Sequence, residues 1–141
     1  MPFWLVKSEP SAWSWSQQVA CGAKGTQWSG VRNHGAKLHL QAMRLGEKCF
    51  FYHSNDGKEI VGLVEVCRTF YPDPSDEGNR FGMVDVCAVK ALPKPVSLAK
   101  IKATPELAKM ALVTNSRLSV QPVTLAEWQL ICEMAELPSS S

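Results

Sequence analysis

The sequence predicts an α+β fold in which helices flank a curled antiparallel sheet or small barrel. Two runs rich in β-branched and aromatic residues, 60–70 and 81–92, are typical of long strands, and a segment rich in Pro, Asp and Gly, 71–78, separates them. The C-terminal part instead carries helix-capping residues followed by a helical apolar stripe. Long antiparallel strands joined by hairpins favour a sheet that curls on itself.

A single domain is expected over residues 1–141. Hydrophobic residues make up 45% of the chain and charged residues 20%, a globular balance that excludes a disordered protein. The sequence contains no internal repeat and no linker that would mark a second domain.

The N-terminal region predicts a strand followed by a short helix. Residues 3–7 combine apolar and β-branched side chains, and the strand should end before Pro10. Ser14 and Gln17 form a capping pattern that opens a helix, which ends before Gly22. One of the two tryptophans that flank the cap should turn inward: Trp13 or Trp15.

The next region predicts a helix, a strand and a hairpin turn. After Asn33 three apolar residues recur with helical spacing: Ala36, Leu40 and Met43. A strand is expected over residues 48–53, and the residues after it, 55–57, read Asn-Asp-Gly, a strong hairpin signal. This turn should lead directly into the first of the two long strands.

The C-terminal region predicts three helix starts and one extended segment. Ser97 and Thr104 each mark a short helix, and residues 112–120 are expected to be extended. Thr124 and Glu127 form a capping box. The helix that follows should place five side chains on one face against the sheet: Leu125, Trp128, Ile131, Cys132 and Ala135.

Charge and cysteine usage narrow the function classes. A net charge of +2 argues against a protein that grips many phosphates through a broad basic field. The basic stretch 32–44 either touches a few phosphates or is the solvated face of a helix.

Five widely spaced cysteines, an odd number, are expected to be small buried hydrophobes in a reducing, cytoplasmic compartment. No zinc-ligand spacing, leader or long apolar run is visible, so we expect no metal, cofactor or membrane partner.

Four short polar motifs in aromatic or β-branched surroundings point to a planar ligand. Each combines a ring or a turn residue with hydrogen-bond donors and acceptors, which is how a nucleobase outside its stack is held. The motifs are Lys7-Ser8-Glu9-Pro10, residues 28–33 (WSGVRN), residues 52–55 (YHSN) and residues 114–119 (TNSRLS). We expect them to wall one pocket.

Most of the candidate ligand residues also have a purely structural explanation, and the sequence leaves both open. Trp28 either stacks on a base or anchors the core, and Asn33 either meets a base edge or caps a helix. Tyr52 is a pocket residue or a core residue. Asn55 faces the cavity or simply belongs to the hairpin turn, and Ser54 is expected to face the cavity more readily than His53.

The charged candidates carry similar alternatives. Lys7 and Ser8 either contact a base carbonyl or phosphate, or are a solvated strand end and the residue that holds the turn at Pro10. Arg117 either clamps a phosphate or forms an ion pair with Glu9. Glu9 would otherwise accept from an exocyclic amine.

Taken in order, these motifs resemble the EVE domain, a PUA-like fold. The resemblance covers nearly the whole chain, and it rests on long fragments: residues 3–10, 51–55, 71–74, 94–98 and 117–123. It implies a mixed or antiparallel β-barrel flanked by helices and a kinship with YTH domains, which enclose N6-methyladenine of RNA in an aromatic cage. EVE domains are proposed to bind modified bases, in particular modified cytosines in DNA.

Three functions remain in competition. The leading one is a monomeric module that binds nucleic acid carrying a modified base. The second is a domain that binds a free nucleotide-like molecule, which would be recognised by binding of the mononucleoside without a strand. The third is a base-modifying enzyme, and no activated nucleophile, carboxylate pair or metal site stands out in the sequence to support it.

Overall fold

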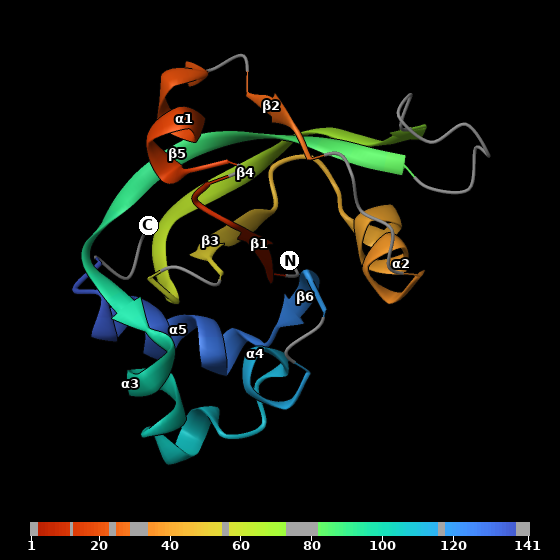
Figure 1. Ribbon diagram of the computed structural model, residues 1–141. Helices are drawn as coiled ribbons and strands as arrows, with labels where there is room; N and C mark the ends of the chain where they lie inside the picture. The colour runs from red at the N-terminus through yellow and green to blue at the C-terminus, as the bar shows by residue number, and fades with distance from the viewer. Residues whose placement is uncertain are drawn as a thin grey trace.

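The computed structural model describes residues 3–11, 13–22, 25–28, 34–54, 57–72, 82–115 and 118–137. Six strands form one sheet in the order β2-β5-β4-β3-β1-β6, with helices around it (Figure 1). The strands are β1 (Phe3–Ser8), β2 (Thr26–Gln27), β3 (Lys48–His53), β4 (Glu59–Pro72), β5 (Gly82–Ser97) and β6 (Val120–Val123). The α+β class with a helix-flanked sheet is therefore confirmed.

The sheet is mixed and curled rather than closed. β1 pairs with β3 in parallel, and the other neighbouring strands are antiparallel. β2 and β6 are the two edges of the order, and they do not pair with each other within the described residues. The register of β4 and β5 shifts at several points, and such bulges bend long strands.

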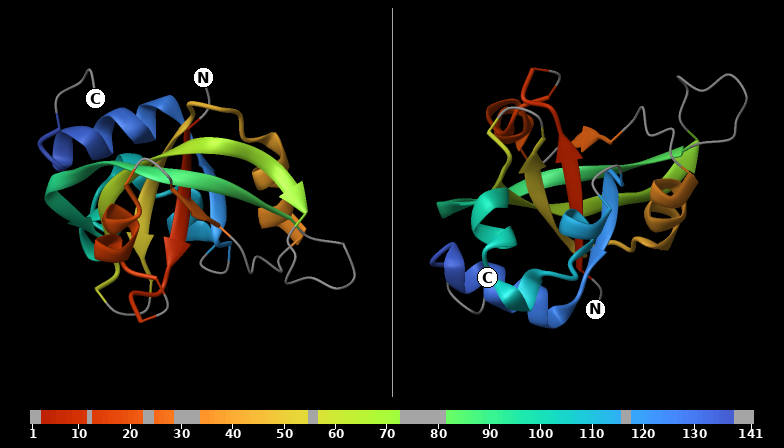
Figure 2. Two further views of the ribbon diagram at one scale, coloured as in Figure 1. Left: turned by 90° about the horizontal axis from the view of Figure 1, so that it is seen from above. Right: turned by 60° about the horizontal axis from the view of Figure 1, so that its bottom comes forward.

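Six helical segments accompany the sheet: α1 (Trp15–Ala20), α2 (His34–Ala42), α3 (Leu98–Lys102), the 3₁₀ turn η2 (Pro105–Leu107), α4 (Ala111–Thr114) and α5 (Leu125–Met134), counted within the described residues. α3, α4 and α5 gather on one side of the sheet, and α1 and α2 lie away from them (Figure 2). Among the described residues, no helix is long and apolar enough to span a membrane.

Each side of the sheet carries its own hydrophobic core. On the side of α5, Leu5 and Phe50 pack with Trp128 and Ile131. On the other side, Trp4 and Val6 pack with residues that include Phe51, Trp28 and Leu40. Successive residues of β1 and β3 thus alternate between the two cores, as the geometry of a strand requires.

Both predicted capping boxes are present. Ser14 accepts from the backbone N–H of Gln17, whose side chain accepts from the backbone of Ser14, and Thr124 and Glu127 do the same for α5. On α5, four of the five predicted residues are buried, but Leu125 is 57% exposed. Leu125 is the first residue of the helix, and side chains tilt toward the helix N-terminus, so it projects past the sheet.

The extended segment predicted over residues 112–120 was wrong in its first part, because Ala111–Thr114 form α4. The β-branched residues Val113 and Thr114 favoured a strand. Their backbone N–H groups instead donate to the Met110 carbonyl, while Met110 and Leu112 are buried. Burial and local hydrogen bonds therefore override the propensity, and only Val120 begins a strand.

The cysteines follow the prediction only in part. Cys49 and Cys132 are buried, Cys21 and Cys87 are intermediate, and Cys67 is exposed. Cys67 begins the outer half of β4, where the strand runs past the core and most side chains meet solvent. Its apolar neighbours in the sequence made it resemble a core position.

Candidate ligand site at the ends of β1 and β3

The parallel pairing of β1 and β3 brings two of the polar motifs together. Lys7 is registered opposite Tyr52 and Ser8 opposite His53, and the Ser54 N–H donates to the Ser8 carbonyl at 2.9 Å. Carboxyl ends of parallel strands meet at the same edge of a sheet, where ligands commonly bind. Two of the four motifs that were predicted to wall one pocket therefore lie next to each other.

The predicted residues that the structure describes fall on both faces of the sheet. The Lys7 Nζ atom lies 6.0 Å from the Tyr52 ring centroid, and Tyr52 belongs to the core under α5. Trp28 belongs to the opposite core. The Ser8 hydroxyl donates to the carbonyl of Trp13, which packs against that same core. Ser8 and Trp28 therefore share one face, and Lys7 and Tyr52 share the other.

Three predicted ligand residues, Asn33, Asn55 and Arg117, lie outside the described residues. Ser54 is half-buried at the strand end. Burial lowers the pKa of Lys7 and raises the pKa of Tyr52. Both shifts disfavour the charged form of the side chain, as expected where a strand end passes from solvent into the core.

Trp28 is one member of an aromatic group that we call the edge-on cluster, formed by Trp15, Phe51 and Trp28. The Phe51 ring lies 5.3 Å from Trp15 at 66° and 5.5 Å from Trp28 at 85°, so both are edge contacts. Trp28 is only 7% exposed, and its backbone N–H donates to the Val84 carbonyl at 2.7 Å. In this structure the indole is packed as a core residue.

Gly62 gives Trp15 its place in the edge-on cluster. A Cβ at Gly62 would lie 2.4 Å from the Trp15 ring, which is closer than real side chains approach. Gly62 is registered opposite Phe51, so the indole covers the sheet where a side chain is missing. A glycine in a central strand commonly marks such a close approach.

A chain of hydrogen bonds ties the segment between β1 and α1 to the sheet. The Trp13 N–H donates to the Glu9 carbonyl at 2.9 Å, and the Trp13 indole N–H donates to Gln18 Oε1 at 2.9 Å. Gln18 is fully buried, and its amide donates to the Val86 carbonyl at 3.0 Å. The turn after Ser8 is therefore held from β1, α1 and β5.

His53 contributes a further link that the sequence analysis missed. Its Nε2 atom accepts from the Trp15 backbone N–H at 3.0 Å, and its ring meets Phe51 at 5.6 Å. Burial lowers the pKa of His53, and Glu59 acts in the opposite direction. The residues in this link are 38 positions apart, so no local pattern pointed to it.

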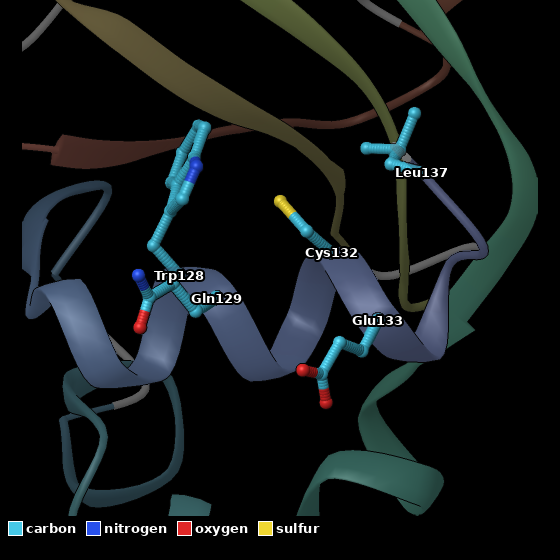
Figure 3. Close-up of a pocket in the computed structure, with 5 residues that line it drawn as sticks. All are labelled: Trp128, Gln129, Cys132, Glu133 and Leu137. Atoms are coloured by element: carbon cyan, nitrogen blue, oxygen red, sulfur yellow. The ribbon is translucent and has the colours of Figure 1, made fainter. Parts of the chain in front are cut away.

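A separate hollow of about 290 Å³ lies at α5. Trp128, Cys132 and Leu137 point toward the sheet around it, while Glu133 points away (Figure 3). Burial raises the pKa of Cys132 to about 11, so this thiol stays protonated. The five predicted ligand residues that the structure describes, Lys7, Ser8, Trp28, Tyr52 and Ser54, are not among the residues that line this hollow. Within the described residues, no three His, Cys, Asp or Glu side chains gather to hold a metal ion.

Comparison with known proteins places this architecture in a family. Rpa0253 from Rhodopseudomonas palustris has a TM-score of 0.92 at 60% identity, covering 96% of this chain and 94% of that one. Human THYN1, solved in complex with DNA that contains 5-methylcytosine, has a TM-score of 0.89 at 34% identity, covering 98% and 99%. The YTH domain of Zygosaccharomyces rouxii MRB1 shares the fold at 20% identity, with a TM-score of 0.56 and coverage of 96% and 86%. The model of the EVE domain matches residues 2–134, and the chain belongs to the EVE domain family.

Proposed function

We propose that this protein is a binding module that recognises a modified nucleobase in nucleic acid, with 5-methylcytosine in DNA as the favoured ligand. One observation carries the proposal: human THYN1, which is similar over nearly the full length of both chains, was solved with DNA that contains 5-methylcytosine. Membership of the EVE family and the shared overall fold support the transfer.

The described part of the site agrees with this chemistry. A base outside its stack presents flat faces and a polar edge, and proteins hold it with aromatic side chains and a few hydrogen bonds. Here Trp15 of the edge-on cluster is hydrogen-bonded through its backbone N–H to His53 at the end of β3, opposite Ser8 and next to Ser54. We keep the predicted ligand set as the proposed site: Lys7, Ser8, Trp28, Asn33, Tyr52, Ser54, Asn55 and Arg117.

The proposed role is binding without catalysis, by a monomer, with nucleic acid as the partner. A small module with a net charge of +2 neutralises few phosphates, so specificity should come from the base rather than from the backbone. Binding of a free nucleotide-like molecule is the second candidate, because a pocket for a single base does not itself require a strand.

A titration of the purified protein against matched fluorescent oligonucleotides tests the proposal. The oligonucleotides differ only in one cytosine, plain or 5-methylated, in single-stranded and duplex DNA and in RNA, at fixed salt. We expect tighter binding to methylated DNA and a log–log salt slope equivalent to about 2 to 4 phosphate contacts. Equal affinity for methylated and plain strands would contradict the proposal, and equal affinity for the mononucleoside would favour the second candidate.

A further inference from the structure

Two adjacent residues at the sheet end hold the segment that precedes α1. His53 ends β3 and Ser8 ends β1, and the register places them opposite each other. The Ser8 hydroxyl donates to the Trp13 carbonyl at 2.6 Å, and His53 Nε2 accepts from the Trp15 N–H at 3.0 Å. Figure 2 shows β1 and β3 ending side by side next to α1. The attachments therefore bracket Ser14, the N-cap of that helix.

The His53 attachment has no substitute within the helix. Trp15 is the first residue of α1, and the first N–H groups of a helix have no acceptor in the preceding turn. The capping side chain of Ser14 is already engaged with the Gln17 N–H. Loss of the imidazole acceptor would leave the Trp15 amide, in a partly buried contact, without that partner.

We propose that His53 is a positioning residue for the base site: its neutral imidazole holds Trp15 and α1 against the sheet, and its protonation releases them and weakens ligand binding. This inference rests on the proposed function. The Trp15 ring contacts Phe51, and Phe51 in turn contacts Trp28 and His53. A shift of Trp15 on loss of the His53 hydrogen bond would therefore change the packing of the edge-on cluster.

The chemistry of imidazole gives the link its pH dependence. A ring nitrogen that accepts a hydrogen bond carries no proton, whereas both nitrogens of the imidazolium are donors. Protonated His53 would therefore face the Trp15 N–H with a second N–H. The neutral form holds the segment, and acidification removes the acceptor without removing any atom of the side chain.

The groups around His53 set the pH range over which its imidazole takes up a proton. Glu59 on β4 is registered opposite His53 and favours the protonated form, while burial lowers the pKa of the imidazole below its usual value. Among the described residues, the partners of His53 in hydrogen bonding, ring contact and strand register include three without titratable side chains: Ser8 on β1, Trp15 on α1 and Phe51 on β3. Asp56, which follows β3 by three positions in the sequence, lies outside the described residues and is included among the test variants.

The binding experiment compares variants that keep or remove the acceptor. An oligonucleotide with one 5-methylcytosine is titrated with wild type, His53→Gln and His53→Phe from about pH 5 to about pH 7.5. Gln offers an acceptor that does not titrate, and Phe keeps a ring without one. We expect wild-type affinity to fall about fivefold or more on acidification, His53→Gln to show a flat profile, and His53→Phe to bind about tenfold more weakly at every pH.

Two charge variants sharpen the assignment. Glu59→Gln removes the group that favours protonation, so the wild-type transition should move to lower pH. Asp56→Asn should leave the transition where it is if Glu59 is the carboxylate that matters. A transition that persists unchanged in His53→Gln would overturn the proposal, because the titrating group would then be another residue, such as His39, whose pKa burial also lowers.

A second readout needs no ligand. Amide hydrogen exchange at Trp15 and the ¹⁵N resonances of the His53 ring, followed against pH, report the link itself. We expect Trp15 protection to fall as His53 protonates, and to stay constant in His53→Gln. If no variant binds any oligonucleotide, the proposed function fails while this readout still decides the link. If protection falls but affinity does not, His53 holds α1 without positioning the base site, and the proposal is refuted.

Discussion

The two aromatic clusters on opposite faces of the sheet are built differently. Under α5, the Trp128 indole is stacked between Phe3, at 4.4 Å and 17°, and Phe50, at 4.0 Å and 21°. On the other face, Phe51 meets both tryptophans of the edge-on cluster at steep angles. We call the Phe3, Phe50 and Trp128 group the stacked cluster. There two rings stack on the central indole, which is only 4% exposed, so we expect it to contribute mainly to stability.

Polar contacts show the same contrast. Around the edge-on cluster, Trp15 and Trp28 are positioned through their backbone N–H groups, by His53 and by the Val84 carbonyl. In the stacked cluster the Trp128 backbone N–H donates to the Thr124 carbonyl, the N-cap of its own helix, at 2.9 Å, and the indole packs with residues such as Leu5 and Ile131. We therefore expect mutations in the two clusters to separate stability from binding.

The largest effect is expected for Trp128→Ala. Truncation of a buried, doubly stacked indole should cost about 3 to 5 kcal/mol of unfolding free energy, while the affinity of the folded fraction for methylated DNA stays close to wild type. Urea unfolding and an oligonucleotide titration on the same preparation measure both. Trp128→Phe keeps a ring in the sandwich and serves as the milder variant. A selective loss of affinity without loss of stability would place the ligand on the α5 side.

Trp28→Ala should affect both quantities. The side chain is 7% exposed, so we expect a loss of about 3 kcal/mol in stability from the cavity left beside Phe51. If the ring also forms a wall of the base site, the binding free energy of the folded variant should weaken by about 1 to 3 kcal/mol. Both are measured at a temperature where the variant is fully folded. Wild-type affinity in the folded variant would make Trp28 a core anchor alone.

Sequence patterns predicted those parts of the fold that depend on neighbouring residues. The strand over residues 48–53 has the bounds of β3, and both capping boxes were visible because their partners are three positions apart. The parallel pairing of β1 with β3 was not predicted, since alternation within each strand carries no information about its partner. α4 was missed because tertiary burial overrides the preference of Val113 and Thr114.

The sequence predicted the candidate site only in part. The motifs at the ends of β1 and β3 do come together, but their residues divide between two faces because Lys7 and Ser8 are adjacent in one strand. No sequence pattern indicated that Gln18 is buried or that His53 bonds to Trp15, since each contact joins a side chain to a backbone group far along the chain. The predicted ligand residues outside the described part of the chain remain predictions.

Gly62→Ala probes the edge-on cluster at a single atom. The added Cβ would meet the Trp15 ring at 2.4 Å, so the indole must shift, at a cost of about 1 to 3 kcal/mol of stability. The same substitution in a Trp15→Ala background should cost much less, because the clash is gone. Unfolding free energies of the four proteins form the cycle. Additive costs would show that Gly62 is needed for a reason other than the place of Trp15.

The smallest effect is expected for Ser8→Ala, where the sequence and the structure assign different roles to one hydroxyl. A base contact would make the substitution reduce discrimination between methylated and plain cytosine. The hydroxyl instead donates to the Trp13 carbonyl at 2.6 Å. We therefore expect Ser8→Ala to weaken the binding free energy by about 1 kcal/mol, equally for both oligonucleotides. Hydrogen exchange should also rise across residues 13–18, which this bond holds to β1. Ser8→Thr keeps the hydroxyl and should retain both affinities. If Ser8→Ala narrows the ratio of the two affinities and leaves exchange unchanged, Ser8 reads the base directly, and the anchoring role is rejected.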